Sequence, residues 1–91
     1  MMPTWQTRTI RINGEAVDLH RIEARWGHEC HFSSITSLPQ GHEQTLLAGE
    51  WAEMDRGDLR ALIAPALGLP REWCKSDGVI ARVRLVADEG K

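Results

Sequence analysis

The chain has 91 residues, of which 42% are hydrophobic and 26% are charged, and its formal net charge is −2. This composition is typical of one small folded domain with a single core, and it excludes a disordered chain. The negative charge argues against a protein whose main task is to neutralise phosphates, and no apolar run is long enough to cross a bilayer.

The start of the chain and its cysteines bear on where it works. Residues 1–5 contain no charged segment followed by an apolar one, so we expect no secretory signal. Cys30 and Cys74 are too few for a disulfide framework, so we expect reduced thiols in a cytoplasmic protein. A bridge between them stays open, because separation in sequence says nothing about distance in space.

The first predicted element is a β-hairpin. Residues 5–12 are rich in β-branched and aromatic side chains, which is typical of a strand. Asn13-Gly14 follows and predicts a type I′ turn, because both residues tolerate the positive φ that this turn requires. A two-residue loop pairs Ile10 with Val17 and makes one face of the hairpin apolar and the other polar.

The hydrophobic alternation changes phase after the hairpin. Val17 and Leu19 are odd-numbered, whereas Ile22, Ala24 and Trp26 are even-numbered. A one-residue shift of this kind predicts a β-bulge or a strand end near His20 and Arg21. Residues 29–36 then predict a third strand.

Residues 58–70 predict the central helix of the domain. Asp58 is a suitable N-cap, and Gly68 lies where a left-handed C-terminal residue is favoured. Pro65 lies inside and predicts a kink or a break, because it lacks a backbone donor. The apolar residues follow the spacing of one buried helical face: Leu59, Leu62, Ile63, Ala66 and Leu67.

The remaining segments complete an α+β prediction. Residues 43–54 fit either a helix, which we favour, or an irregular strand over 46–54. Residues 71–77 predict a short helical turn or a loop, and strict alternation over 79–87 predicts a last strand. The expected order is β-β-(β)-α-α-β, a single domain over 1–91 in which one or two helices pack on one face of a small antiparallel sheet.

One candidate site is a zinc centre, because zinc prefers imidazole and thiolate ligands. Residues 28–31 read His-Glu-Cys-His. On a strand His28 and Cys30 would point to the same side, and His42 and Cys74 would have to complete the site. The spacing matches no standard zinc pattern, so a zinc-stabilised domain remains an alternative and we predict no cofactor.

Catalysis is not predicted. A cysteine nucleophile needs a base and an orienting group, and neither cysteine lies in a local catalytic motif. Glu50 and Glu53 would lie one helical turn apart, but such paired acids are more often a solvated face. The glycines are scattered as turn residues and form no phosphate-binding loop.

A second function class is DNA binding. Residues 66–70 read Ala-Leu-Gly-Leu-Pro, a run that resembles the end of the first helix, the turn and the start of the recognition helix in helix–turn–helix families. The resemblance implies a transcriptional regulator that reads DNA with residues 59–77 and uses the strand over 79–87 as a wing. Its basic residues would be Arg71, Lys75, Arg82 and Arg84.

The aromatic residues favour a binding module instead. The chain has four tryptophans, one phenylalanine and no tyrosine. We expect Trp51 in the core and Trp5 paired with Ile22 across the hairpin. We expect Trp26 and Trp73 at exposed ends of elements, where tryptophan commonly anchors an interface.

An acidic middle of the chain offers a second binding feature, because a negative surface attracts a basic partner. The residues expected to bind a partner are Trp26, Glu43, Glu50, Glu53, Asp55 and Trp73. The sequence therefore favours a small non-catalytic module that binds a protein or nucleoprotein complex, with neither a membrane nor direct nucleic-acid binding expected. Compact α+β proteins of this size are frequent among accessory proteins and inhibitors of phages and mobile elements, such as anti-CRISPR proteins, and we expect that character here.

Overall fold

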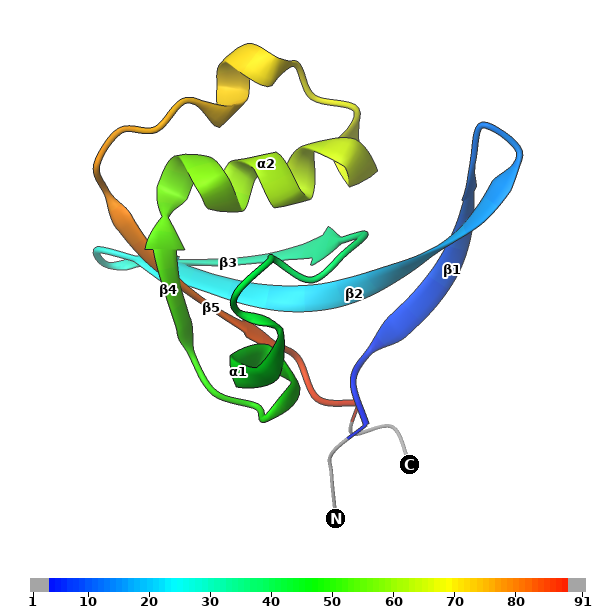
Figure 1. Ribbon diagram of the computed structural model, residues 1–91, viewed down its shortest axis with the longest axis horizontal. Helices are drawn as coiled ribbons and strands as arrows, with labels where there is room; N and C mark the ends of the chain where they lie inside the picture. Colours follow the sequence, from blue (N-terminus) through cyan, green and yellow to red (C-terminus); the bar gives the residue numbers. More distant parts are fainter. Residues whose placement is uncertain (1–3, 89–91) are drawn as a thin grey trace.

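The computed structural model describes residues 4–88 and confirms the α+β class. A five-stranded antiparallel sheet packs against two helices (Figure 1). The strands are β1 (Thr7–Ile12), β2 (Glu15–Trp26), β3 (Glu29–Ile35), β4 (Ala52–Asp55) and β5 (Ile80–Leu85). The helices are α1 (Glu43–Leu47) and α2 (Arg56–Leu67), and a 3₁₀ turn, η1 (Arg71–Cys74), follows α2 as the predicted short turn.

The sheet is built around β2, which pairs with three other strands. β1 pairs with residues 15–20 of β2, and β5 pairs with residues 22–25 along the same edge. β3 pairs along the opposite edge, and β4 extends the sheet beyond β5. The start of β1 and the end of β5 meet beside Arg21. The Arg21 N–H donates to the carbonyl of Gln6, which precedes β1, and the Arg21 carbonyl accepts from the N–H of Val86, which follows β5.

The N-terminal hairpin forms as predicted. Ile10 pairs with Val17, and Asn13 and Gly14 have φ values of 53° and 84°, as a type I′ turn requires. The tip of this hairpin extends away from the rest of the sheet (Figure 1).

The bulge predicted near His20 and Arg21 is wrong, because β2 runs unbroken from Glu15 to Trp26. The phase change has a different cause. Leu19 is buried on one face of β2, whereas Ile22 is buried on the other face beneath the helices. The hairpin and the body of the sheet therefore bury opposite faces of one continuous strand.

The core lies between the two helices and one face of the sheet. Leu46 of α1 and Leu59 of α2 are fully buried against it. Each such side chain stabilises the fold by roughly 1.5–3 kcal/mol. The sheet contributes Ile22, Ala24, Ile35, Ala52, Met54, Ala81, Val83 and Leu85 to the same cluster.

The favoured single helix over residues 43–54 is wrong. α1 ends at Leu47, and Gly49 has a φ of 81°, which a helix does not accommodate. The chain then enters β4 at Ala52, and Met54 follows it into the core with strand spacing. The chain therefore has a strand between its two helices that the predicted order lacks.

The start of α2 also differs from the prediction. Asp55, and not Asp58, is the N-cap, because its carboxylate accepts a hydrogen bond of 2.7 Å from the Gly57 N–H. Gly57 is buried in the first turn of α2.

The end of α2 is as predicted, since Gly68 is left-handed with a φ of 66°. Pro65 lies inside the helix without breaking it, and the helix continues to Leu67.

Candidate functional site

Within residues 4–88 no helix covers the second face of the sheet, which we call the open sheet face. The strand register decides which side chains share this face. Arg84 of β5 pairs with Glu23 of β2, and Arg82 pairs with Arg25. On β3, Phe32 pairs with Glu23, and on β4 Glu53 pairs with Arg82. Because successive side chains of a strand point to opposite faces, these residues all lie on the face that is turned away from the core.

A buried carboxylate lies at the centre of the open sheet face. Glu23 is only 5% exposed, and its two oxygens accept from two arginines. The Arg25 Nε and Nη2 lie 2.9 and 2.7 Å from one oxygen, and the Arg84 Nε and Nη2 lie 2.9 and 2.8 Å from the other. The Cys30 thiol adds a contact of 3.3 Å.

Burial by itself would raise the pKa of Glu23, but hydrogen bonds from Arg25, Arg84 and Cys30 outweigh it and lower that pKa. The carboxylate is therefore ionised at neutral pH and holds both guanidinium groups in fixed positions.

Trp51 lies beside this ion cluster. The guanidinium carbon of Arg84 lies 4.4 Å from the centre of its ring, and those of Arg25 and Arg82 each lie 5.4 Å away. Such distances are those of cation–π contacts. We call Glu23, Arg25, Trp51, Arg82 and Arg84 the arginine–tryptophan cluster.

The prediction that Trp51 belongs to the core is wrong. The adjoining strand β4 turns Ala52 and Met54 toward the helices, so strand alternation directs Trp51 to the open sheet face. The residue is half-buried there among arginines.

The arginine–tryptophan cluster still offers hydrogen-bond donors to a partner. The side chains of Arg25 and Arg84 are 47% and 41% exposed, and each donates only part of its five N–H groups to Glu23. Arg82 forms no ion pair with another residue of the described chain. Groups of this kind bind carboxylates well, because the guanidinium fork matches two carboxylate oxygens.

The other three tryptophans also differ from the predictions. Trp5 forms a bridge with Ala87 and does not pair with Ile22. Trp26 and Trp73 are half-buried and packed against the core, so the expected exposure of both is wrong, while their expected role in binding a partner stays a prediction.

Local packing explains the burial of these two tryptophans. Trp26 stacks on His31 with a centroid separation of 4.5 Å. Trp73 lies on the turn that folds back on α2, with Arg60 above its ring.

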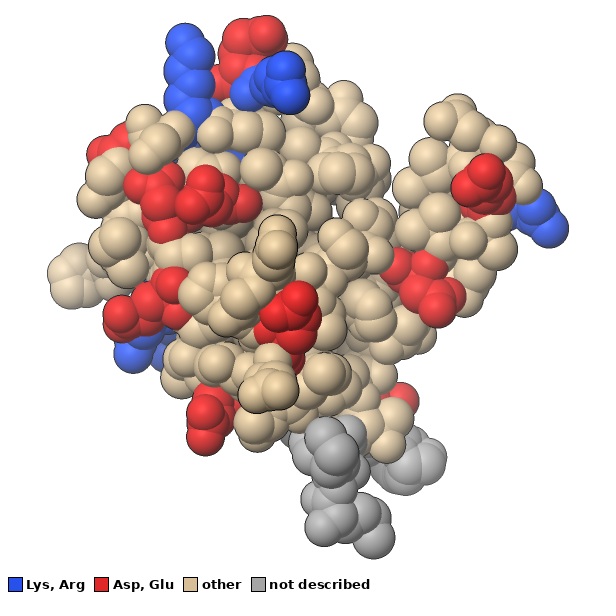
Figure 2. All heavy atoms as spheres, viewed as in Figure 1, with Lys and Arg blue, Asp and Glu red and all other residues tan. Residues whose placement is uncertain are grey.

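The acidic residues predicted to bind a partner lie in different settings. Glu43, Glu50 and Glu53 are exposed. Asp55 instead accepts hydrogen bonds from Gly57, Ser76 and Gly78, so its carboxylate joins α2 to the segment before β5. Figure 2 shows acidic side chains as the more numerous charges on the face in view.

The predicted zinc ligands do not come together. Among the described residues, no three His, Cys, Asp or Glu side chains form a group that could hold a metal ion. His28 lies in the turn before β3, His42 precedes α1, and Cys74 is in η1. Cys30 and Cys74 are both free thiols, so the disulfide alternative is also wrong.

The segment after α2 is not a recognition helix. It consists of the single 3₁₀ turn η1, which is too short to present a helical face to a DNA groove. Arg71 and Lys75 lie on or next to this turn, whereas Arg82 and Arg84 lie on the open sheet face. The structure thus divides the four basic residues of the DNA-binding alternative between two surfaces.

The sequence reasoning missed Glu23, Arg25 and Trp51. A signal was present, because charged residues alternate with apolar ones at positions 21, 23 and 25 of β2 and at 82 and 84 of β5. Two strands with this pattern place their charges on one face if they pair with each other.

No helix in residues 4–88 is long and apolar enough to cross a membrane. No protein-family model, curated protein or solved structure matches the chain. What the chain does is therefore inferred from its own residues.

Proposed function

We propose that this chain is a non-catalytic binding module that attaches to an acidic surface of a partner protein, alone or within a nucleoprotein complex. The contact would be made by the arginine–tryptophan cluster. The observation that supports this proposal is the Trp51 ring surrounded by three guanidinium groups, two of which are fixed by the buried Glu23.

Residue type and preorganisation both favour binding. Tryptophan and arginine are enriched among the residues that dominate interface energies. Immobilising a long side chain on binding costs roughly 0.5–1.5 kcal/mol. Because Glu23 already fixes Arg25 and Arg84, much of this cost is met when the chain folds.

The same geometry favours carboxylates over nucleic-acid bases. Single-stranded nucleic acid binds by stacking bases on open aromatic faces. Guanidinium groups already lie over the Trp51 ring, and that of Arg21 lies 5.3 Å from the centre of the Phe32 ring. The open sheet face therefore offers N–H donors instead of open aromatic rings.

We extend the proposal to the biological role of an accessory or inhibitor protein of a phage or mobile element, as anti-CRISPR proteins are. Such a protein acts by covering a surface that its target needs for another contact. A standard interface buries roughly 800 Å² on each partner. That is about an eighth of the 6179 Å² surface of this molecule.

Capture from a lysate of the native host tests this proposal. The tagged wild-type chain is compared with Arg82→Glu, Trp51→Ala and the control Arg71→Glu, which carries the same charge change on η1. Half of each sample is treated with nuclease. Circular dichroism first confirms that each variant is folded.

The proposal predicts one protein, retained after nuclease treatment, that is captured by wild type and Arg71→Glu but not by the other two variants. Equal capture by all four chains would contradict it. Enrichment that disappears with nuclease would replace it with nucleic-acid binding.

A further inference from the structure

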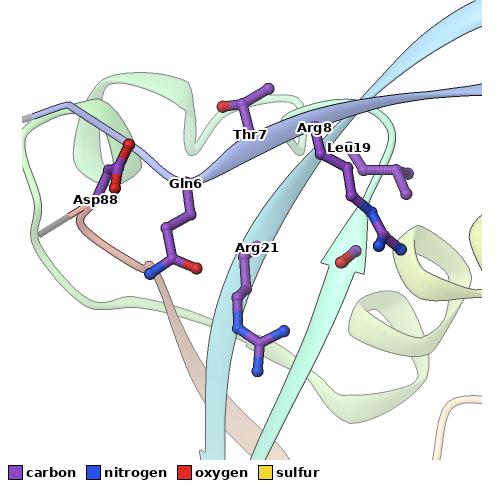
Figure 3. Close-up of a pocket in the computed structure, with 7 residues that line it drawn as sticks. Gln6, Thr7, Arg8, Leu19, Arg21 and Asp88 are labelled. Carbon is purple, nitrogen blue, oxygen red and sulfur yellow. The ribbon is translucent and has the colours of Figure 1, made fainter. Parts of the chain in front are cut away.

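A cavity of about 370 Å³ opens on the open sheet face, beside the point where the start of β1 and the end of β5 meet on β2. Figure 3 shows the side chains that line it. Its lining includes Gln6, Arg8, Leu19, Arg21, Ser34 and Asp88. This cavity is separate from the arginine–tryptophan cluster, with which it shares no residue.

Arg21 lies in the middle of the cavity lining, with lining residues on the strands at both of its sides. The Arg21 N–H donates to the Gln6 carbonyl, and Ser34 of β3 is the Cα partner of Arg21 on the other side. Side chains directly opposite one another on one face have Cβ atoms about 4.5–5.5 Å apart. Arg8 follows Gln6 by two residues and is the diagonal neighbour of Arg21. Arg8, Arg21 and Ser34 therefore line one opening.

The cavity lining carries two guanidinium groups, those of Arg8 and Arg21, and one carboxylate, that of Asp88. Neither Arg8 nor Arg21 forms an ion pair with another residue in the range 4–88, in contrast to Arg25 and Arg84. Asp88 also lines the cavity, and in the view of Figure 3 Gln6 lies between it and the two arginines.

Two neighbouring contacts limit the motion of the lining. The Gln6 amide donates to the Ala87 carbonyl at 3.2 Å, which anchors that side chain between β1 and the end of β5. The Arg21 guanidinium lies above the Phe32 ring, which supports it from β3.

We propose that this cavity binds an oxyanion, a carboxylate or phosphate group, between Arg8 and Arg21. Guanidinium groups form short, charge-assisted hydrogen bonds with both kinds of group, and often in pairs. The Ser34 hydroxyl is placed to donate a further hydrogen bond. The site does not depend on the proposed function, because it uses different residues and binds a small ion without a partner protein.

Titration of the full chain with inorganic phosphate and, separately, with acetate tests this site. Backbone amide and arginine Nε–H signals are followed by NMR at constant ionic strength. The variants are Arg21→Gln and Arg8→Gln, and Arg71→Gln is the control with the same change outside the cavity. Two variants on different strands keep the test decisive if one of them fails to fold.

We expect saturable shifts centred on Arg8, Arg21 and Ser34, with binding weakened roughly tenfold or more in each cavity variant and unchanged in the control. Saturation by phosphate alone would assign a phosphate group, and saturation by acetate would assign a carboxylate. Linear shifts with both salts, or equal binding by Arg21→Gln and Arg71→Gln, would overturn the proposal.

Discussion

Glu23 and Arg84 are 61 residues apart in the chain, yet two nitrogens of the Arg84 guanidinium lie 2.9 and 2.8 Å from one Glu23 oxygen. The pairing of β2 with β5 creates this contact. It holds Arg84 against Trp51, so the fold itself sets the geometry of the proposed binding surface.

Replacing Glu23 by glutamine should destabilise the fold by about 2 kcal/mol, because hydrogen bonds to charged groups contribute roughly 1.5–3 kcal/mol. The matched control is Glu53→Gln, an exposed change on the same sheet face that should remain within about 0.5 kcal/mol of wild type. Urea unfolding followed by circular dichroism measures both. Equal stability of Glu23→Gln and wild type would show that the ion cluster does not support the fold.

Stability should decrease in acid. The pKa of Glu23 is lowered because hydrogen bonds from its arginines outweigh burial, and the pKa of Asp77 is lowered chiefly by a hydrogen bond from Arg56. The pKa of Asp55 is lowered chiefly by the Gly57 N–H. A lowered pKa in the folded state gives stabilisation that is complete above the unfolded-state pKa and is lost as the pH falls through the folded-state value.

The urea midpoint should therefore be steady near neutral pH and should fall below about pH 4.5. A midpoint that stays constant or rises between about pH 5 and pH 2 would contradict these shifts.

Asp55→Ala should lower the melting temperature more than Asp58→Ala. The Asp55 carboxylate caps α2 and also accepts hydrogen bonds from Ser76 and Gly78, whereas Asp58 is exposed in the first turn. Thermal unfolding of the two variants compares them directly. A larger loss with Asp58→Ala would instead support the helix start expected from the sequence.

Gly57→Ala should destabilise the protein by about 1–3 kcal/mol. A Cβ at this position would lie 2.5 Å from the Lys75 carbonyl oxygen and 2.7 Å from the Ser76 Cα. In an uncrowded helix the same substitution stabilises by about 0.8–1 kcal/mol. The sign of the change in unfolding free energy therefore reports whether α2 packs this closely on the segment before β5.

Local chemistry explains which elements were predictable. The Asn13-Gly14 turn fixes the register of the hairpin by itself. The left-handed Gly68 ends α2, and alternation over β5 separates its buried residues from Arg82 and Arg84. Each of these features depends on a few neighbouring residues, so the sequence contains the whole signal.

Non-local pairing explains what was missed. β4 has only four residues, and its pairing with β5 defines it as a strand. The placement of Trp51 on the open sheet face follows from that pairing. The contact between Glu23 and Arg84 likewise requires β2 and β5 to be neighbours, which no local pattern reveals.

The most direct measurement is the affinity of the purified chain for its captured partner, determined by isothermal titration calorimetry at low and high ionic strength. Arg82→Glu should weaken binding at least about tenfold, because it places a negative charge against an acidic surface. Arg71→Glu should bind as wild type does, and wild-type affinity should fall as salt increases. Wild-type affinity in Arg82→Glu would show that the partner binds elsewhere and would contradict the proposed function.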